Sequence, residues 1–343
     1  MLENVAVVIL NWNGKAYLER FLPSVIKYSG NARIIVADNH STDDSIQFVT
    51  EHFPTVEIVK NDTNGGFAKG YNDALRKIDA SYYLLLNSDI EVTENWILPL
   101  LTCVQQKDVV ACQPKVLSYK QKNKFEHAGA SGGFLDRNYY PFCRGRILEI
   151  TEVDEGQYDN EVEIFWASGA CLLIEAKVFH QENGFDELFF AHMEEIDLCW
   201  RLKRRGHRIK VAPSSVVYHV GGGTLDYMSP QKTYLNFRNS LLMITKNHHG
   251  NVFLKIFYRL ILDGMAGLLF LAKGSPRHTY SVVRAHFSYY RLLPVMLKKR
   301  SQMKTTHFQM NKVGIYRGSI LWAKYVKKIN RYAQLNLRLF SND

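Results

Sequence analysis

The amino-terminal part of the chain alternates between short apolar runs and segments whose apolar residues recur at helical spacing. The apolar runs predict β-strands within residues 4–11, 32–38, 56–61, 82–87 and 108–117. Helical spacing predicts helices over residues 15–28, around 46–49, over 66–78 and over 93–101, with Ser41 or Thr42 available to cap the second. Because strands that alternate with helices form a parallel sheet covered on both faces, the pattern predicts an α/β fold.

Polar residues follow these apolar runs. Asn11 and Asn13 follow the first run, Asp38 ends the second, and Asn87-Ser88-Asp89 follows the apolar residues 84–86. Ligands of open parallel sheets bind at the carboxyl ends of the strands, so Asp89 is a candidate metal ligand. The alternative is that Asn87 and Asp89 only form a turn and cap the next helix. Neither G-x-G-x-x-G nor G-x-x-x-x-G-K-[ST] occurs at the first turn, which argues against a dinucleotide-binding fold or a P-loop enzyme.

Seven motifs occur in an order and spacing that resembles glycosyltransferase family 2, most closely its bacterial rhamnosyltransferase-type members. They are VVILNWNG, VADNHSTDDS, NGGFAKGYN, LLLNSDIEV, SGACLLIEAKVF, GFDELFFAHMEEIDLCWRLKRRGHRI and VYHVGGGT. The resemblance covers roughly residues 4–226. It implies a GT-A fold, a Rossmann-like and mostly parallel sheet flanked by helices. It also implies transfer of a sugar from a nucleoside diphosphate, with inversion at the anomeric carbon.

The resemblance assigns donor contacts to the strand ends. Asp38 matches the position that contacts the nucleoside base or ribose, and the alternative is an Asx-turn within DNHSTD. Asn11, Asn13, Asn87 and Asp89 join it on the donor side. Gly66 and Lys69 lie at a predicted helix start, where backbone amides approach phosphate closely, although a glycine pair also simply makes a turn.

A departing nucleoside diphosphate needs a divalent cation or fixed donors to stabilise its negative charge. The family commonly has D-x-D where this chain has Asn87-Ser88-Asp89, so one carboxylate remains. Mg²⁺ tolerates this because it keeps waters and uses phosphate oxygens. His219 matches an occasional additional metal or diphosphate ligand of the family, and a histidine ligand would favour Mn²⁺. The alternative for His219 is a surface or core histidine with a satisfied ring.

Inverting transfer requires a base that removes the proton of the acceptor hydroxyl. The family places this base in a Glu-Asp-x-Asp motif, which here reads Glu194-Glu195-Ile196-Asp197, so the resemblance implies Glu195 as base with Glu194 and Asp197 beside it. Glutamate is one methylene longer than aspartate, and catalysis is sensitive to such displacements. The alternatives are a helical pair between Asp197 and Arg201, or three acids that only decorate a helix amino terminus.

The resemblance places Trp166, Ser168 and Gly169 on the acceptor side. Trp166 is then a candidate to stack on a sugar ring, and an ordinary core tryptophan is the alternative. The insert at residues 120–163 has no clear meaning at this level, and acceptor specificity is expected there because loops vary while the scaffold stays rigid.

Charge divides the chain into two predicted regions. Residues 1–226 hold 23 Lys and Arg against 31 Asp and Glu, a net charge of −8, and form the predicted GT-A domain. Residues 227–343 hold 20 against 2, a net charge of +18. Lys255, Arg259 and Asp263 lie on one helical stripe with apolar residues around it, which favours an amphipathic helical region at an anionic membrane surface. No nucleic-acid-reading module accompanies the charge, and the alternative is a set of helices packed on the catalytic domain.

The remaining features concern the compartment and the competing functions. The five cysteines form no C-x-x-C pair, so we expect reduced thiols. No signal peptide is expected at the amino terminus, which suggests a cytoplasmic protein held peripherally at the cytosolic face of the inner membrane. The predicted function is transfer from a dTDP- or UDP-sugar to a glycan or lipid-linked glycan, with Mg²⁺ or Mn²⁺. The alternatives are a catalytically weak nucleotide-sugar-binding assembly subunit and a nucleotidyltransferase.

Overall fold

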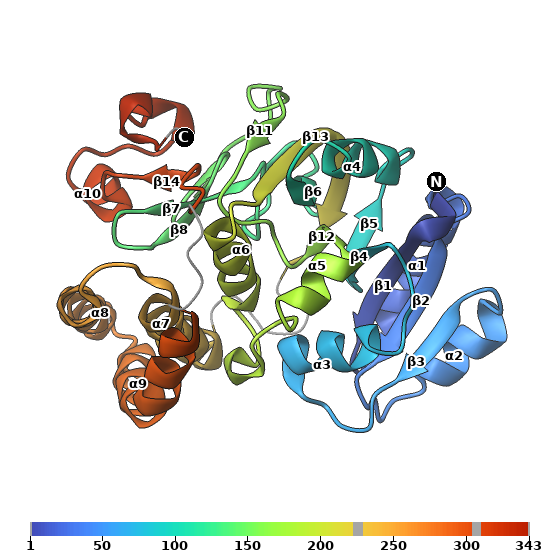
Figure 1. Cartoon of the computed structure of the whole chain (residues 1–343), viewed down its shortest axis with the longest axis horizontal. Helices are drawn as coiled ribbons and strands as arrows, with labels where there is room; N and C mark the ends of the chain where they lie inside the picture. Colours follow the sequence, from blue (N-terminus) through green and yellow to red (C-terminus); the bar gives the residue numbers. More distant parts are fainter. Residues whose placement is uncertain (1, 222–228, 304–309, 342–343) are drawn as a thin grey trace.

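The computed structural model describes residues 2–221, 229–303 and 310–341, and its centre is a curled sheet between helices (Figure 1). Within these residues the strand order is β11-β13-β6-β12-β4-β1-β2-β3, and β5 pairs with β13. The strands of this sheet are β1 (Val5–Asn11), β2 (Arg33–Asp38), β3 (Glu57–Lys60), β4 (Tyr82–Asn87), β5 (Ile90–Val92), β6 (Val109–Ser118), β11 (Val162–Glu163), β12 (Cys171–Glu175) and β13 (Arg208–His219). The expected α/β fold is confirmed.

The first half of the sheet is parallel, as the alternating pattern predicted. Strands β1, β2, β3 and β4 pair in parallel. The connecting helices are α1 (Lys15–Tyr28), α2 (Ser45–His52) and α3 (Gly66–Leu75), and α4 (Ile97–Val104) follows β5. Helix α1 buries Leu18, Phe21, Leu22 and Val25, a stripe of apolar residues three or four apart. The predicted cap of α2 was wrong, because Asp44 precedes that helix while Ser41 and Thr42 bond to the first turn.

The second half of the sheet is mixed. Strand β12 runs antiparallel to both β4 and β6, while β13 runs parallel to β6 and antiparallel to β5. Helices α5 (Ala176–Gln181) and α6 (Glu194–Arg204) follow β12, with the 3-10 helix η2 (Glu187–Phe189) between them. Hydrophobic clusters fill both faces of the sheet, so this half is as fully buried as the first.

A smaller second sheet lies beside the first. Its strand order is β10-β9-β8-β7-β14. The strands are β7 (Gly133–Asp136), β8 (Pro141–Cys143), β9 (Arg146–Ile147), β10 (Ile150–Thr151) and β14 (Ile315–Tyr316). The insert at residues 120–163 therefore forms ordered structure that the carboxyl-terminal part of the chain completes.

The carboxyl-terminal helices pack on the catalytic half. They are α7 (Pro230–Asn247), α8 (Val252–Ala272), α9 (Pro276–Met303) and α10 (Ile320–Tyr325), with short 3-10 helices at Tyr332–Gln334 and Leu337–Leu339. Helix α7 contacts α6, and α8 and α9 pack on α7 at the lower left of Figure 1. The predicted boundary between residues 226 and 227 lies outside the described residues. In the described part of the chain, no helix has the length and apolar character needed to cross a bilayer.

The five cysteines are all buried, and none is bonded to another. This agrees with the expectation of packed, reduced thiols.

Candidate functional site

The predicted polar strand ends meet at one edge of the sheet. In the strand register, Asn11 lies opposite Asp38, and Leu10 lies opposite Asn87. The backbone amide of Asn87 donates to the carbonyl of Ala170, which leads into β12. The donor-side and acceptor-side stretches predicted from the sequence therefore adjoin each other.

The residues nearest the first turn hold the turn together. Asn11 donates to Ser45 Oγ at 2.9 Å, and Asn13 accepts from the Thr42 amide at 2.7 Å. A carboxylate oxygen of Asp38 accepts from the Ser41 amide at 3.2 Å, so the Asx-turn that was the alternative for Asp38 is present. The structure thus gives all three residues a local bonding role at the sheet edge, and their contact with a donor stays a prediction.

Asp89 and His219 are neighbours because β5 and β13 pair. His219 lies opposite Ile90 in that register, which brings its Nε2 to 3.1 Å from Asp89 Oδ1. Its Nδ1 lies 3.1 Å from Glu126 Oε2, and the Asn87 side-chain amide is 3.5 Å from Nε2. The ring of His219 is buried between two carboxylates that are buried as well.

Charge at this cluster is set by the two carboxylates. Burial alone would lower the pKa of His219, but Asp89 and Glu126 together raise it to about 10. Glu126 was missed by sequence reasoning because it lies in the insert and belongs to none of the recognised motifs. No spacing in the sequence signalled that it would reach His219.

The residue types of this cluster suit a divalent cation, and because the pKa of His219 is about 10, its ring must lose a proton before Nε2 can ligate one. Neighbouring ligands of an octahedral ion bound at about 2.1 Å lie roughly 3 Å apart, close to the separation of Asp89 Oδ1 and His219 Nε2. A carboxylate, an imidazole and an amide oxygen suit Mg²⁺ or Mn²⁺. Among the described residues no group of three or more His, Cys, Asp or Glu forms a metal site by itself.

Glu194 and Glu195 begin helix α6, and burial is the main cause of the shifts in their pKa values. Burial raises the pKa of Glu195 to about 7, although backbone amides at the helix start oppose the shift. Burial and the charge of Glu195 raise the pKa of Glu194 well above its ordinary value. One buried carboxylate oxygen of each residue has no hydrogen-bond partner within the described residues. Glu195 is thus suited to hold a proton near neutral pH.

The loop before α6 has an unusual backbone. Phe190, His192 and Met193 all have positive φ angles, of 65°, 70° and 74°, a conformation that costs non-glycine residues energy. Asn239 of α7 holds this loop, because its buried side-chain amide lies within hydrogen-bonding distance of the carbonyls of residues 189, 191 and 192, at 2.7–2.9 Å. Arg238 adds hydrogen bonds to residues 188 and 189. The carboxyl-terminal region therefore positions the segment that carries Glu195.

Asp197 lies inside the fold rather than in an open site. It is fully buried and accepts from Arg201 at 2.9 Å, Lys246 at 2.8 Å and Asn247 at 2.7 Å. Lys246 also bonds Asp186 at 2.8 Å. The alternative interpretation of Asp197, a helical pair with Arg201, is confirmed, and the geometry gives this carboxylate a structural role that joins α6 to α7.

The three predicted acceptor-side residues lie in different surroundings. Trp166 is 4% exposed and donates from its indole to the Phe134 carbonyl at 3.0 Å, so it is a core tryptophan and presents no open ring for a sugar. Ser168 is also buried, and its amide donates to Gln113 Oε1 at 2.9 Å. Gly169 differs, because a methyl group placed on it would lie 3.7 Å from Glu195 Cβ. The segment at residues 169–170 therefore bonds the strand end at Asn87 and lies beside the predicted base.

Gly66 and Lys69 lie at the start of α3. Gly66 has a φ of 77°, and a side chain there would meet the carbonyl oxygen of Phe190. This glycine therefore allows α3 to approach the loop before α6. The Lys69 ammonium group bonds Asp73 at 2.7 Å and remains partly exposed, so its predicted phosphate contact is untested.

Burial and the positive side chains of Arg146 and Lys232 lower the pKa of two histidines, His127 and His192. Burial is the main reason that the pKa of His127 falls to about 3, and the positive charge of Arg146 lowers it further. Burial likewise lowers the pKa of His192 to about 4, with a smaller contribution from Lys232. Lys232 acts on both histidines, and the side chain of Arg146 lies 3.4 Å from the ring of His127. Both histidines are therefore neutral near pH 7.

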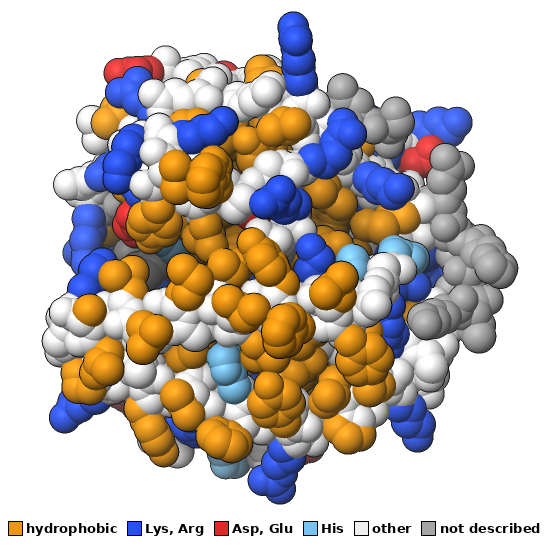
Figure 2. Space-filling view, turned by 90° about the vertical axis from the view of Figure 1, so that its left-hand side faces the viewer, with side chains coloured by type: hydrophobic (Ala, Val, Ile, Leu, Met, Phe, Trp, Pro, Cys, Tyr) orange, Lys and Arg blue, Asp and Glu red, His pale blue; other side chains and the backbone are white. Residues whose placement is uncertain are grey.

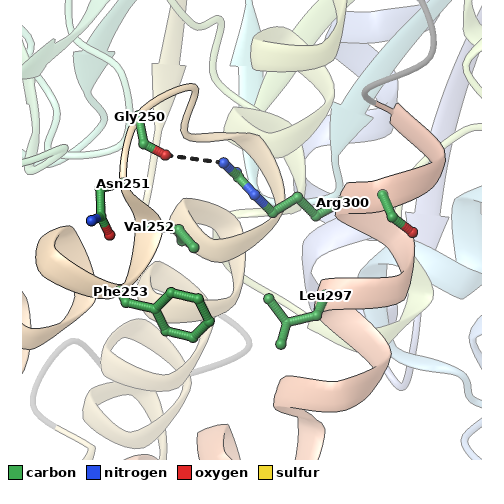
Figure 3. Close-up of a pocket in the computed structure, with 7 residues that line it drawn as sticks. Gly250, Asn251, Val252, Phe253, Leu297 and Arg300 are labelled. Carbon is green, nitrogen blue, oxygen red and sulfur yellow. Dashed lines mark hydrogen bonds between the residues drawn. The ribbon is translucent and has the colours of Figure 1, made fainter.

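A surface pocket lies elsewhere. It opens between the start of α8 and the end of α9, beside Val252, Phe253 and Leu297 (Figure 3). Arg300 lines it, but its guanidinium already donates to the Gly250 carbonyl at 3.2 Å and to two further carbonyls. Neither an acid nor a histidine is among the residues that line this pocket.

Comparison with known proteins identifies the fold. A solved structure of GalNAc-T7 with UDP, GalNAc and Mn²⁺ superimposes with a TM-score of 0.57 at 14% identity, covering 90% of this chain and 58% of that one. The fold is thus that of the GT-A glycosyltransferases. The sequence of residues 6–164 matches the family described as Glycosyl transferase family 2.

Two curated relatives extend the match. The low-salt glycan biosynthesis hexosyltransferase Agl10 of Haloferax volcanii is 25% identical over 71% of this chain and 76% of its own length. The N-acetylglucosaminyl-diphospho-decaprenol L-rhamnosyltransferase of Mycobacterium tuberculosis is 24% identical over 64% of this chain and 76% of its own length. The resemblance inferred from the seven motifs is confirmed, and the family favours glycosyl transfer over the alternative of nucleotidyl transfer.

Proposed function

We propose that the protein transfers a sugar, with inversion, from a nucleoside diphosphate sugar to a hydroxyl group of a lipid-linked glycan. The observation that carries this proposal is the position of residues 169–170, which bond the polar strand end at Asn87 and lie beside the base candidate Glu195. A donor diphosphate at the strand end and an acceptor hydroxyl at Glu195 would then meet beside this segment.

Asp89 and His219 would hold the divalent cation, with Asn87 adding its amide oxygen. When bound, the cation supplies a Lewis acid that stabilises the charge of the departing diphosphate. We assign Glu126 as the positioning residue of His219, because a carboxylate on the far nitrogen of a ligating imidazole fixes the tautomer and orientation of the ring. In support, Glu126 Oε2 lies 3.1 Å from His219 Nδ1.

Glu195 would remove the acceptor proton. The base must be ionised to accept that proton, and a pKa of about 7 leaves a large ionised fraction while keeping the carboxylate basic. Glutamate is longer than the aspartate of the family, and the loop before α6, which Asn239 holds, sets how far this side chain reaches. Burial and the charge of Glu195 raise the pKa of Glu194 well above its ordinary value, and Asp197 already bonds Arg201, Lys246 and Asn247. Neither residue takes the role of base in this proposal.

The names of the relatives suggest the substrates. One relative transfers L-rhamnose to a sugar on a decaprenyl diphosphate, which supports a dTDP- or UDP-sugar donor and a diphospholipid-linked acceptor here. The positive groups around Arg146 and Lys232 suit the diphosphate of such an acceptor. The reaction would take place at the cytosolic face of the inner membrane, with the protein attached peripherally.

A catalytically weak binding subunit remains the second candidate, favoured by Asn87 and Glu195 where the family commonly has aspartates. Donor hydrolysis separates the two candidates. Purified protein is incubated with UDP-, dTDP- or GDP-sugars and Mg²⁺ or Mn²⁺, and released nucleoside diphosphate is measured beside a thermal-shift series. Stabilisation by one donor together with slow, metal-dependent release supports the enzyme. Stabilisation without release supports the binding subunit, and the absence of both overturns the donor site.

A further inference from the structure

Helix α8 buries charged residues and exposes apolar ones, which is the reverse of an ordinary surface helix. Its buried residues are Val252, Ile256, Arg259, Asp263 and Gly267, spaced three or four apart. Two of these five are charged: Arg259 donates to the Asn138 carbonyl at 2.8 Å, and Asp263 accepts from Tyr140 at 3.3 Å. Arg259 and Asp263 belong to the charged stripe seen in the sequence, and the structure shows that they face inward.

The outward face of α8 is apolar. Its exposed large hydrophobic residues are Phe253, Leu254, Phe257, Tyr258, Ile261, Met265, Leu268, Leu269 and Leu271. Helix α9 continues this surface with Tyr280, Val283, Phe287, Tyr290 and Val295. Figure 2 shows hydrophobic side chains spread across the lower part of this face. We call the exposed hydrophobic residues of α8 and α9 the apolar face. Contiguous apolar surfaces of this kind mark interaction sites.

The charge around the apolar face has one sign. Residues 252–303 contain nine Lys and Arg and a single acid, Asp263, which is buried. Lys273, Arg277, Arg284, Arg291 and Lys298 are exposed. A second copy of this chain docking face to face would bring two positive surfaces together, which is unfavourable. An anionic lipid surface offers both the apolar interior and the negative charge that this face lacks.

We infer that the apolar face of α8 and α9 inserts into the interfacial layer of an anionic bilayer, with α8 lying along the membrane surface. This inference deepens the membrane location of the proposed function and rests on it. Helices α8 and α9 pack on α7, and Asn239 of α7 holds the loop before Glu195. Insertion would therefore hold the catalytic base close to the layer in which a lipid-linked acceptor resides.

Apolar burial, more than charge, would drive this attachment. Two of the basic residues of this region are already paired within the protein, since Lys299 bonds Asp186 at 2.6 Å and Arg300 is buried against backbone carbonyls. The pocket of Figure 3 lies beside Phe253, at one end of the apolar face. We therefore expect binding that weakens with salt but persists when exposed charges are screened.

The test is co-sedimentation of the full chain with vesicles of phosphatidylglycerol and phosphatidylcholine in equal parts. We compare wild type with Phe257→Gln/Leu268→Gln, which replaces two side chains that are 63% and 67% exposed. Wild type should bind at low and high salt, and the double variant should lose at least about tenfold in partitioning, because apolar area drives insertion. Its melting temperature should stay unchanged, since neither side chain is buried.

Leu98→Gln is the matched control, because Leu98 is an exposed leucine on α4, outside the apolar face. It should bind vesicles as wild type does. Wild type that ignores anionic vesicles, or a double variant that binds as tightly as wild type, would overturn the inference. So would a wild-type dimer in sedimentation velocity that the double variant abolishes, since the apolar face would then meet a second copy. Donor hydrolysis without vesicles reports on the proposed reaction separately.

Discussion

Glu195 and the Asp89–His219 pair sit in different surroundings, and this difference underlies their proposed roles. Glu195 lies at a helix start with an unpaired carboxylate oxygen, and burial raises its pKa to about 7. Asp89 faces an imidazole that a second carboxylate also contacts. One environment favours proton exchange, while the other favours holding a cation.

The pH dependence of turnover tests the role of Glu195. Because the base must be ionised, kcat/KM should rise as the pH increases through about 7 and level off above that value. A pH series with saturating metal measures this directly. A profile that is flat between acidic and mildly basic pH would contradict a base with a raised pKa.

Metal affinity tests the cluster at His219. Asp89→Ala should weaken Mn²⁺ binding most and His219→Ala less, while Glu126→Gln should cost about tenfold to a hundredfold because it removes the partner that orients the imidazole. Titration calorimetry with Mn²⁺ and nucleoside diphosphate gives the affinities without turnover.

Glu91→Gln is the matched control for this series, since Glu91 lies on β5 near Asp89 but bonds Lys122. It should leave Mn²⁺ affinity unchanged. Equal affinity in wild type and Asp89→Ala would remove the cation from this site, and a Glu126→Gln variant that binds Mn²⁺ normally would remove the positioning role.

At the scale of the elements, α7 is the support of the catalytic loop. Asn239→Ala deletes the amide that bonds the carbonyls of residues 189, 191 and 192. Leaving buried carbonyls unpaired should cost about 1–3 kcal/mol of stability, and the released backbone strain should lower turnover further. Chemical unfolding and steady-state kinetics measure the two effects.

Asn236→Ala serves as the control, because Asn236 lies on the same helix and makes no side-chain hydrogen bond in the described part of the chain. It should change neither quantity. A variant of Asn239 with normal stability and turnover would show that the loop keeps its shape without α7.

Local pattern predicted the elements that depend on local contacts. The helix over residues 15–28 and the strand over 82–87 appear as expected, because their apolar spacing decides which face is buried. The pairing of β5 with β13, which creates the contact between Asp89 and His219, joins residues far apart in sequence. So does the pairing of β7 with β14. The periodicity of a strand does not indicate which strand it pairs with. The contact between Glu126 and His219 and the formation of the second sheet therefore could not be predicted.

Helix α8 shows the limit of periodicity most clearly. The stripe of Lys255, Arg259 and Asp263 was visible in the sequence, but an amphipathic pattern does not state which side faces water. Arg259 stacks over the ring of Tyr140 at 3.9 Å, and Tyr140 belongs to the insert. Only this long-range partner reveals that the charged side is the buried side.

At the scale of the whole molecule, the two predicted regions act together. The carboxyl-terminal helices supply Lys246 and Asn247 to Asp197 of α6, and β14 completes the second sheet. The prediction of a separate basic region captured the charge but not this integration. Packing on the catalytic half and attachment to a membrane are compatible, because α7 provides the first and the outer faces of α8 and α9 are proposed for the second.

The central claim is that Glu195 is the base of an inverting sugar transfer, and one variant tests it most directly. Glu195→Gln keeps the size of the side chain but cannot accept a proton, so transfer should fall at least about a hundredfold. Donor affinity, measured by thermal shift with the nucleoside diphosphate sugar and Mn²⁺, should stay close to that of wild type. Near-normal turnover in Glu195→Gln would contradict the account and place the base elsewhere.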